Sequence, residues 1–392
     1  MKAIILAAGK GTRLRPLTDT TPKPLVKVLG KEIIIYTLEL LKPYVEEFII
    51  VIQYKKELFQ ETLGDSFGGI KITYHTQGEE PGTGGAIKGI DTKGSGDYII
   101  TVGDQIFFKN DIKPILLGHS YGVLSTRVTN PENYGIFQIS TNNYLKSIIE
   151  KPTQDVGNLA NISFYKVPSE IFEVINHVPL SPRGEIEITD AITLLTNTYQ
   201  FKVHEGQFID IGYTWNLLDA NKSFLGDLSE STIEGTVEDN VIIKGNIILE
   251  AGAVIKSGTY IEGNCYFGKN SIVGPNAYVR GNTSLGDGGK IGFSVEVKNS
   301  YIGENSKLSH LSYLGDSIVG NNVNLGCGFK TANLRHDGKN MRVMVKGNLI
   351  DTGRRKLGGI IGDDVKTGIN TSIYPGRIIE TGSSTLPGEI VK

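Results

Sequence analysis

"VEDNVIIKGNIILEAGAVIKSGTYIEG", residues 237–263, places an apolar residue at every sixth position, and the pattern continues well beyond this stretch. Ten residues keep that spacing without interruption: Val237, Ile243, Leu249, Ile255, Ile261, Phe267, Val273, Val279, Leu285 and Ile291. Four positions after each of them stands a second residue that is mostly small, such as Ala253, Ser271 or Ala277. Because a β-strand directs successive side chains to opposite faces, a six-residue unit can combine a short strand with a tight corner and turn two side chains inward.

This hexapeptide repeat predicts a left-handed parallel β-helix in the C-terminal part of the chain. The period slips by one residue near Tyr301 and again near Ile318, and a coil can absorb such slips as bulges or changes of corner. Between Phe329 and Gly359 the repeat gives way to a polar, basic stretch, and it returns at Ile361. We therefore expect a loop over 329–359 that leaves the solenoid. Its role stays open between a contact with a neighbouring chain, a coenzyme phosphate or solvent alone; its basic residues include Arg354, Arg355 and Lys356.

The sequence before about Phe224 follows a different pattern, in which apolar runs alternate with helical stretches. The runs are KAIIL (2–6), EFIIVI (47–52), IKITYH (70–75) and DYIITV (97–102), and the helical stretches include 32–41 and 83–90. This alternation predicts a Rossmann-like α/β domain with a mostly parallel sheet, whose functional residues lie at the carboxyl ends of the strands. We therefore predict two domains, residues 1–225 and 226–392.

Composition narrows the classes of partner. The chain of 392 residues has 40 Lys and Arg against 42 Asp and Glu, so no general basic charge favours a nucleic acid or an anionic membrane. Two cysteines, Cys265 and Cys327, cannot form a disulfide framework, and the six histidines lack the spacing of a zinc site. No apolar run approaches the roughly 18 residues of a membrane span, so we expect a cytoplasmic protein.

A glycine loop follows the first apolar run. It reads LAAGKGTRLRPLTDTTPKPL, residues 6–25, and gathers Lys10, Arg13 and Arg15 around two glycines. It is neither a Walker A sequence, in which Ser or Thr follows the lysine, nor a dinucleotide fingerprint, which has a third glycine. These residues alone leave open a tight connection or a phosphate cradle. With Arg13 and the pair Pro22-Lys23 included, the stretch resembles the signature of the sugar-1-phosphate nucleotidylyltransferases.

That resemblance implies a reaction in which a sugar phosphate attacks the α-phosphorus of a nucleoside triphosphate and pyrophosphate leaves. It implies catalytic roles for Arg13, in the triphosphate cradle, and for Lys23, on the α-phosphate. Asp104 in "ITVGDQIFF" and Asp210 in "FIDIGYTW" would hold Mg²⁺. The implied nucleotide-binding residues are Leu6, Ala8, Gly9, Gly11 and Thr12 in the loop, and Gln77, Gly82 and Thr83 in "TQGEEPGTGGAI".

The same resemblance implies a pocket for the sugar 1-phosphate. Glu150 would bind the sugar hydroxyls and Lys151 the phosphate. The sequence departs from the family at Ser163, which stands where a glycine would lie near the sugar. The other residues implied to form or shape this pocket are Tyr134, Gly135, Asn161, Glu185 and Glu187.

The repeat region carries a second, more specific resemblance. "VEVKNSYIGENSKLSHLSYLGDSIVGNNVNLG" (295–326) and "AYVRG" (277–281) resemble the bifunctional enzymes that join glucosamine-1-phosphate acetyltransferase to N-acetylglucosamine-1-phosphate uridylyltransferase. The resemblance implies that His310 takes a proton from the sugar amine as the amine attacks acetyl-CoA, and that Glu296 orients the imidazole. The residues implied to hold the sugar phosphate are Arg280, Lys298, Tyr313, Asn324 and Asn333. Cys327 and Phe329 replace the family's alanine and threonine, and we expect both near the thioester.

Together these resemblances imply a Mg²⁺-dependent enzyme that makes UDP-N-acetylglucosamine from UTP and the sugar 1-phosphate, with a second site that acetylates an amino-sugar 1-phosphate from acetyl-CoA. Because hexapeptide solenoids pack side by side, we expect a homotrimer. Two alternatives stay open. One is a monofunctional glucose-1-phosphate uridylyl- or thymidylyltransferase whose β-helix is only a trimerisation scaffold, and the other is a nucleotide-sugar sensor without turnover. The sequence also leaves open whether the nucleotide is UTP or dTTP and whether the sugar is glucose or one of its amino derivatives.

Overall fold

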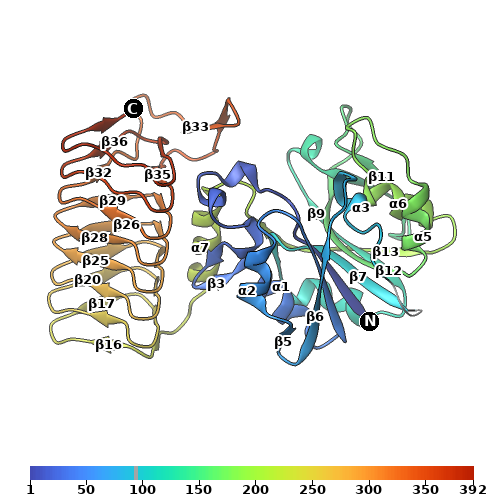
Figure 1. Cartoon of the computed structure of the whole chain (residues 1–392), viewed down its shortest axis with the longest axis horizontal. Helices are drawn as coiled ribbons and strands as arrows, with labels where there is room; N and C mark the ends of the chain where they lie inside the picture. The colour runs from blue at the N-terminus through green and yellow to red at the C-terminus, as the bar shows by residue number, and fades with distance from the viewer. Residues whose placement is uncertain (92–95) are drawn as a thin grey trace. The chain divides into compact units, whose positions relative to one another are not determined.

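The computed structural model describes residues 1–91 and 96–392, and Figure 1 shows its elements. The described residues form two compact units. The first consists of Met1–Lys10, Pro22–Leu25 and Ile33–Asp210, and the second of Gly11–Thr21, Val26–Glu32 and Ile211–Lys392. Two segments of the glycine-loop region therefore pack with the C-terminal half of the chain, which no sequence pattern indicated. The boundary between residues 225 and 226 stays a prediction.

The first unit is built on a ten-stranded sheet with a parallel centre. β1 (Lys2–Leu6) lies between β7 (Asp97–Val102) and β4 (Glu47–Ile52), and β6 (Ile70–Thr76) pairs with β4. These are the four predicted apolar runs. The burial of β1, β4 and β7 is nearly continuous, because both faces of the central parallel sheet are covered, whereas β6, next to the short β5, is mostly half-buried. The other strands are β5 (Ser66–Phe67), β9 (Tyr121–Arg127), β10 (Gly135–Ile139), β11 (Leu145–Glu150), β12 (Leu159–Pro168) and β13 (Phe201–Glu205).

Helices cover both faces of this sheet. One face packs against α1 (Ile33–Leu41), α2 (Glu57–Leu63) and α4 (Lys109–Leu117), and the other against α3 (Gly82–Gly85), α5 (Ile171–Val174) and α6 (Ile188–Leu195). The helix expected over 32–41 is confirmed as α1. The helix expected over 83–90 is wrong in length, because only Gly82–Gly85 is α-helical. Gly89, at φ +72°, adopts a left-handed conformation that an α-helix does not contain.

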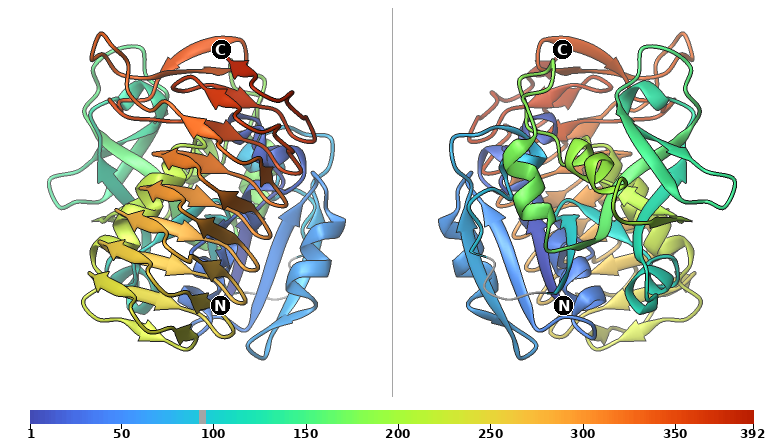
Figure 2. Two further views of the ribbon diagram at one scale, coloured as in Figure 1. Left: turned by 90° about the vertical axis from the view of Figure 1, so that its left-hand side faces the viewer. Right: turned by 90° about the vertical axis from the view of Figure 1, so that its right-hand side faces the viewer.

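The second unit contains the predicted β-helix, whose strands form three parallel sheets (Figures 1 and 2). The first sheet is β15 (Thr232–Ile233), β18 (Ile247–Leu249), β21 (Cys265–Phe267), β24 (Thr283–Leu285), β27 (Tyr301–Ile302), β30 (Ile318–Val319), β35 (Ile360–Ile361) and β37 (Ile378–Ile379). The second is β16 (Thr236–Val237), β19 (Val254–Ile255), β22 (Ile272–Val273), β25 (Lys290–Phe293), β28 (Lys307–His310) and β31 (Asn324–Leu325). The third is β17 (Ile242–Lys244), β20 (Tyr260–Glu262), β23 (Tyr278–Arg280), β26 (Glu296–Lys298), β29 (Tyr313–Gly315), β32 (Lys330–Thr331), β36 (Ser372–Ile373) and β38 (Ile390–Val391).

The interior of the β-helix confirms the six-residue pattern. From Leu249 to Ile291 each repeating apolar residue is fully buried, and the small residues four positions later, such as Ala253, point into the same core. The two slips in period are coils shortened by one residue. Cys265 pairs with Thr283, eighteen positions on, whereas Ser284 pairs with Tyr301 and Tyr301 with Ile318, each seventeen positions on.

The expected excursion from the solenoid starts later than predicted. Phe329 is fully buried in the β-helix core, and β32 continues to Thr331, so the chain leaves the coil only after that residue. Phe329 stands four positions after Leu325, at the second inward position of its repeat. The excursion carries an antiparallel hairpin of β33 (Arg342–Val345) and β34 (Asn348–Asp351), and the coil resumes with β35. The expectation that Phe329 lies near the thioester is therefore wrong.

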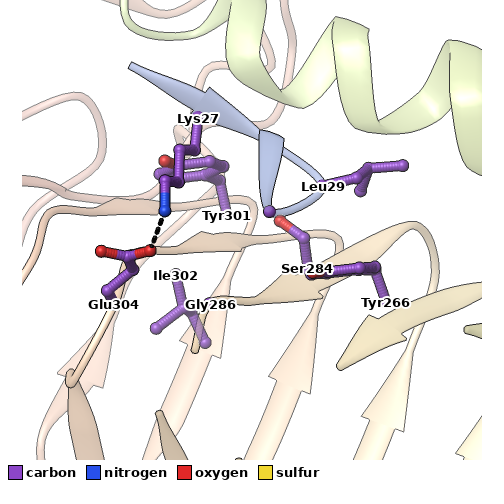
Figure 3. Close-up of a pocket in the computed structure, with 10 residues that line it drawn as sticks. Lys27, Leu29, Tyr266, Ser284, Gly286, Tyr301, Ile302 and Glu304 are labelled. Carbon is purple, nitrogen blue, oxygen red and sulfur yellow. Dashed lines mark hydrogen bonds and ion pairs between the residues drawn. The ribbon is translucent and has the colours of Figure 1, made fainter. Parts of the chain in front are cut away.

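The N-terminal segments of the second unit contact the β-helix through a short hairpin, β2 (Lys27–Val28) and β3 (Lys31–Glu32). Lys27 Nζ lies 2.5 Å from Glu304 Oε1 (Figure 3). Gly30 has φ +74°, and a Cβ there would meet the hydroxyl of Tyr266 at 2.0 Å, so only glycine fits. The unit also contains three elements outside the β-helix: the 3₁₀ turns at Thr12–Leu14 and Leu17–Asp19, and α7 (Asn216–Gly226).

Candidate functional site

Three residues predicted from separate motifs meet at one end of the first unit's sheet. Asp104 follows β7, Lys23 begins a 3₁₀ turn, and Asp210 ends β14 (Phe208–Asp210), which pairs with β8 (Gln105–Phe107). Lys23 Nζ lies 2.7 Å from Asp104 Oδ2 and 3.8 Å from Asp210 Oδ1. The lysine is 6% exposed, whereas both carboxylates are half-buried. A buried ammonium beside two accessible carboxylates can hold phosphate oxygens together with a cation.

The donor set fits magnesium rather than a metal held by protein ligands alone. Among residues 1–91 and 96–392, no three His, Cys, Asp or Glu side chains gather in a way that could hold a metal. Asp104 and Asp210, which both lie near the ammonium of Lys23, offer a pair of hard oxygen ligands. Mg²⁺ prefers such a partial set because it keeps several waters and takes other ligands from phosphates.

The glycine loop places its residues in both units. Ala8 is buried at the end of the first segment, and a Cβ on Gly9 would meet nothing within 4 Å, which leaves its backbone approachable. Gly11, at φ +60°, opens the turn that carries Thr12 and Arg13. The Arg13 guanidinium lies 5.2 Å from the centre of the Tyr213 ring, a cation–π contact that directs it while leaving its donors usable.

The segment implied to read the base is tied to the chain near residue 186. A Cβ on Gly82, at φ +98°, would lie 2.4 Å from the carbonyl oxygen of Ile186, so glycine is required there. The Thr83 hydroxyl accepts a hydrogen bond from Ile188 N at 3.2 Å. The Gln77 amide donates to the carbonyl of Glu80 at 3.0 Å. Gly82 and Thr83 thus have structural partners, and their roles toward a nucleotide stay predictions.

The implied sugar pocket contains an ion-pair cluster centred on Arg183, a residue that we did not single out from the sequence. Its guanidinium lies 3.3 Å from Glu150, 2.9 Å from Glu185 and 3.2 Å from Glu187. The pKa of Glu150 is raised, first by burial and then by the charge of Glu187. Burial also raises the pKa of Glu187. An arginine next to two glutamates in "RGEIE" was the available signal.

Backbone geometry explains two further positions of this pocket. Gly135 lies so close to Glu150 that a Cβ would meet its Oε2 at 2.8 Å, so glycine lets the carboxylate approach the backbone. Ser163, the departure from the family's glycine, has φ +56°. Asn161 secures this strained turn, because its Oδ1 accepts from Ser163 N at 2.9 Å and its Nδ2 donates to the Tyr165 hydroxyl at 2.6 Å. Lys151 and Tyr134 meet through a backbone hydrogen bond of 2.9 Å.

A polar cluster on the third sheet of the β-helix brings together Lys298, Tyr313 and Asn333, three of the residues implied to hold the sugar phosphate. Lys298 and Asn333 share a partner in Asp316, which the sequence analysis missed and whose side chain is 5% exposed. Asp316 accepts from Lys298 Nζ at 3.2 Å and from Asn333 Nδ2 at 2.6 Å, and Asn333 also donates to the Tyr313 hydroxyl. Burial raises the pKa of Tyr313, which favours the neutral phenol. The only sequence signal for Asp316 was its closeness to the implied residues.

Arg280 and Glu296 form a second pair on the same sheet. Arg280 donates two hydrogen bonds to Glu296 Oε1, at 3.0 and 2.7 Å. His310 ends β28 on the neighbouring sheet, and its side chain makes no hydrogen bond to any residue in the described ranges. The implied pairing of Glu296 with His310 therefore has a competitor in Arg280 within this chain, and it stays a prediction.

The surroundings of His310 are apolar and accessible. It pairs in register with Phe293, which is 45% exposed, and its carbonyl accepts from the backbone N–H of Gly328, next to the half-buried Cys327. Leu311, the next residue, is 58% exposed. Asn324 is exposed on β31 of the same sheet. The predicted acetyl-transfer residues thus divide between two sheets that meet at one corner of the coil.

Among residues 1–91 and 96–392, no helix combines the length and apolar character needed to cross a bilayer.

Two protein-family descriptions match the chain. "Nucleotidyl transferase" matches residues 2–226, and "GMPPB C-terminal domain" matches residues 261–382.

Curated relatives align over nearly the whole chain. A protein of Sulfurisphaera tokodaii named "Bifunctional sugar-1-phosphate nucleotidylyltransferase/acetyltransferase" is 44% identical, and the alignment covers 100% of this chain and 97% of the relative. A "Bifunctional protein GlmU" of Methanocaldococcus jannaschii is 42% identical, with 98% and 92% covered. A "Low-salt glycan biosynthesis nucleotidyltransferase Agl11" of Haloferax volcanii is 37% identical, with 83% and 94% covered.

Proposed function

Because the chain belongs to the family of bifunctional sugar-1-phosphate nucleotidylyltransferases/acetyltransferases, we propose that it transfers the uridylyl group of UTP to N-acetylglucosamine 1-phosphate and releases pyrophosphate. The observation that carries this proposal is the position of Lys23 between Asp104 and Asp210. A phosphoryl transfer of this kind depends on positioning and on charge stabilisation, and these three residues supply both.

Each residue has a defined part in the proposed reaction. The sugar phosphate oxygen attacks the α-phosphorus, and the P–O bond to pyrophosphate breaks. Lys23 donates to the α-phosphate oxygens as negative charge builds on them, and Arg13 binds the departing phosphates. Asp104 and Asp210 would hold Mg²⁺, which when bound neutralises phosphate charge and orients the in-line attack. Glu150 accepts from the sugar hydroxyls, and Arg183 keeps its carboxylate in place.

The second proposed activity is acetylation of glucosamine 1-phosphate by acetyl-CoA on the β-helix. Lys298, Asn333 and Tyr313, organised by Asp316, support a site for a phosphorylated sugar. His310 takes a proton from the sugar amine as the amine nitrogen attacks the thioester carbonyl, and the coenzyme leaves as a thiol. The exposed Phe293 and Leu311 beside His310 support assembly into a homotrimer, in which a neighbouring chain covers this edge.

A pyrophosphate-release screen tests the first activity and its specificity. UTP and dTTP are each combined with glucose, glucosamine, galactosamine and N-acetylglucosamine 1-phosphates in the presence of Mg²⁺. The proposal expects the highest kcat/KM for UTP with N-acetylglucosamine 1-phosphate. A higher value for glucose 1-phosphate with either nucleotide, without thiol release from acetyl-CoA, favours the monofunctional alternative. A cytoplasmic location, where UTP and acetyl-CoA are available, is part of the same proposal.

A further inference from the structure

A cavity of about 490 Å³ lies within the second unit, where the chain leaves the β-helix after β32. The first residues of the excursion line one side of it, among them Ala332 and Leu334. The corner after β36 lines the other side with Tyr374 and Arg377, and Arg342 of β33 completes the wall. The volume lies in the usual range of small-molecule sites, about 300–1,000 Å³.

Backbone contacts fix the two sides of the cavity against each other. Ala332 N donates to the carbonyl of Ile373 at 2.9 Å, directly before Tyr374. Gly376 has φ +68°, and a Cβ there would lie 3.1 Å from the carbonyl oxygen of Arg342. The strand β33 therefore packs closely on the corner after β36, and the side chain of Arg342 starts from a fixed position beside this corner.

The side chains that line the cavity carry a net positive charge. Arg335 and Asp337 form an ion pair, with 2.8 Å between Nε and Oδ1, so their charges compensate each other. Arg342 and Arg377 are exposed, and their guanidinium groups make no hydrogen bond or ion pair within the part of the chain that the structure describes. With His336 neutral, two positive charges remain available to an anion.

Tyr374 gives the cavity an aromatic face. Its side chain is 47% exposed, and its ring makes no stacking or cation–π contact within residues 1–91 and 96–392. A nucleobase stacks on an exposed tyrosine ring, and guanidinium groups bind phosphate oxygens through charge-assisted hydrogen bonds. A tyrosine together with two unpaired arginines therefore fits a nucleoside diphosphate.

The cavity adjoins the cluster proposed to hold the sugar phosphate. Asn333, a member of that cluster, lies in the chain between Ala332 and Leu334, which both line the cavity. His310, the proposed base, precedes β29, whereas Asp316 of the cluster follows it, so the strand separates the base from the phosphate end. An amino sugar that extends from His310 to Asn333 therefore has its phosphate next to the cavity, and a group linked to that phosphate enters it.

We propose that the cavity binds the nucleotide part of UDP-glucosamine, and that the β-helix acetylates this nucleotide-linked amino sugar as well as glucosamine 1-phosphate. The inference rests on the acetyl transfer proposed above and extends its range of acceptors. The phosphate next to the sugar stays with Lys298 and Asn333, Arg342 and Arg377 bind the second phosphate, and the uracil stacks on Tyr374.

The chemistry at the amine is the same for both acceptors. The amine nitrogen attacks the thioester carbonyl of acetyl-CoA, a C–N bond forms, and the C–S bond breaks. His310 takes the proton from the nitrogen, and the coenzyme leaves as a thiolate that takes up a proton. Uridylyl transfer to glucosamine 1-phosphate, a reaction of the class proposed for the first unit, supplies the nucleotide-linked acceptor.

Thiol release with the two acceptors tests this proposal. Wild type should show a KM for UDP-glucosamine about tenfold below that for glucosamine 1-phosphate, because the second phosphate and the base add contacts. Arg377→Met and Tyr374→Ala should each raise the KM for UDP-glucosamine about tenfold and leave the KM for glucosamine 1-phosphate and for acetyl-CoA within twofold of wild type. Tyr374→Phe should keep the wild-type KM, because the ring remains. The matched control is Lys356→Met, which removes an exposed cation of the same excursion that does not line the cavity.

Three kinetic results overturn the proposal while acetyl transfer stands. The first is thiol release with glucosamine 1-phosphate but not with UDP-glucosamine. The second is an unchanged KM for UDP-glucosamine in both Arg377→Met and Tyr374→Ala. The third is a higher KM for acetyl-CoA in these variants, which assigns the cavity to the nucleotide of the coenzyme.

If wild type releases thiol with neither acceptor, acetyl transfer itself fails, and calorimetry with UDP decides the role of the cavity. Two UDP sites per chain in wild type, one of them the site for uridylyl transfer, and one site in Arg377→Met support nucleotide binding by the cavity. Equal numbers of sites in the two proteins refute it.

Discussion

The ammonium of Lys23 lies 2.7 Å from one carboxylate oxygen of Asp104, and the side chain of this lysine is nearly buried. The two residues are 81 positions apart in the chain and come from different motifs. Burying a lysine is costly unless an acidic partner is present, and Asp104 provides that partner while keeping its own carboxylate accessible. The ion pair therefore keeps the charged ammonium of Lys23 at the place where phosphate charge has to be stabilised.

Loss of either carboxylate should disable nucleotidyl transfer. Asp104→Asn and Asp210→Asn each remove a negative oxygen ligand from a pair, and we expect pyrophosphate release to fall at least about a hundredfold. Asp65→Asn, at an exposed position of the same unit, serves as the control and should keep the wild-type rate. Rates within fivefold of wild type for both active-site variants would overturn the metal assignment.

The raised pKa of Glu150 makes a pH dependence testable. Burial and the charge of Glu187 favour its protonated form, so Glu150 loses its charge at a higher pH than an ordinary glutamate, whose pKa is about 4.3. A protonated Glu150 accepts weaker hydrogen bonds from sugar hydroxyls. The KM for the sugar 1-phosphate should therefore rise as the pH falls from neutral toward that raised pKa. Glu150→Gln should show a high KM with a flatter profile, and an unchanged profile in that variant would exclude Glu150 as the titrating group.

Asp316 should be required for the acetyl-transfer site. Asp316→Asn leaves Lys298 without its carboxylate and offers the donor of Asn333 an amide in its place. We expect the KM for glucosamine 1-phosphate to rise about tenfold, while uridylyl transfer stays at the wild-type rate. Asp364→Asn, a surface change in a neighbouring coil, is the matched control. An equal loss of both activities in Asp316→Asn would indicate general destabilisation instead of a local role.

Substitution of Phe329 distinguishes a ring that packs in the β-helix core, as in the structure, from a ring near the thioester, as expected from the sequence. Because its ring fills the β-helix core, Phe329→Thr should lower the stability of the β-helix by about 3 kcal/mol and should not increase thiol release. Thermal unfolding followed by circular dichroism measures the first effect and a thiol assay the second. Increased thiol release with unchanged stability would place the ring in the acetyl-CoA pocket after all.

Features that repeat along the chain or lie in one contiguous motif could be predicted from the sequence, whereas contacts between distant residues could not. The six-residue period predicted the β-helix because every coil repeats one packing requirement, and it contained the information that Phe329 points inward. Lys23 could be identified from the glycine loop and its Pro-Lys pair, because a motif of neighbouring residues can be recognised from the sequence alone. Asp316 was not predicted because the stacking of coils brings Lys298 and Asn333 to it. Arg183 was not predicted because its partner Glu150 lies on a distant strand.

The separation of the two activities is tested most directly by measuring pyrophosphate and thiol release in the same preparations of wild type, Asp104→Asn and His310→Ala. Asp104→Asn should lose pyrophosphate release and keep thiol release, because the β-helix cluster does not use Asp104. His310→Ala should keep pyrophosphate release, with thiol release lower by about 10²–10⁴-fold. Equal losses of both products in either variant, or the absence of thiol release from wild type with glucosamine 1-phosphate, would show that the two activities do not lie on separate sites.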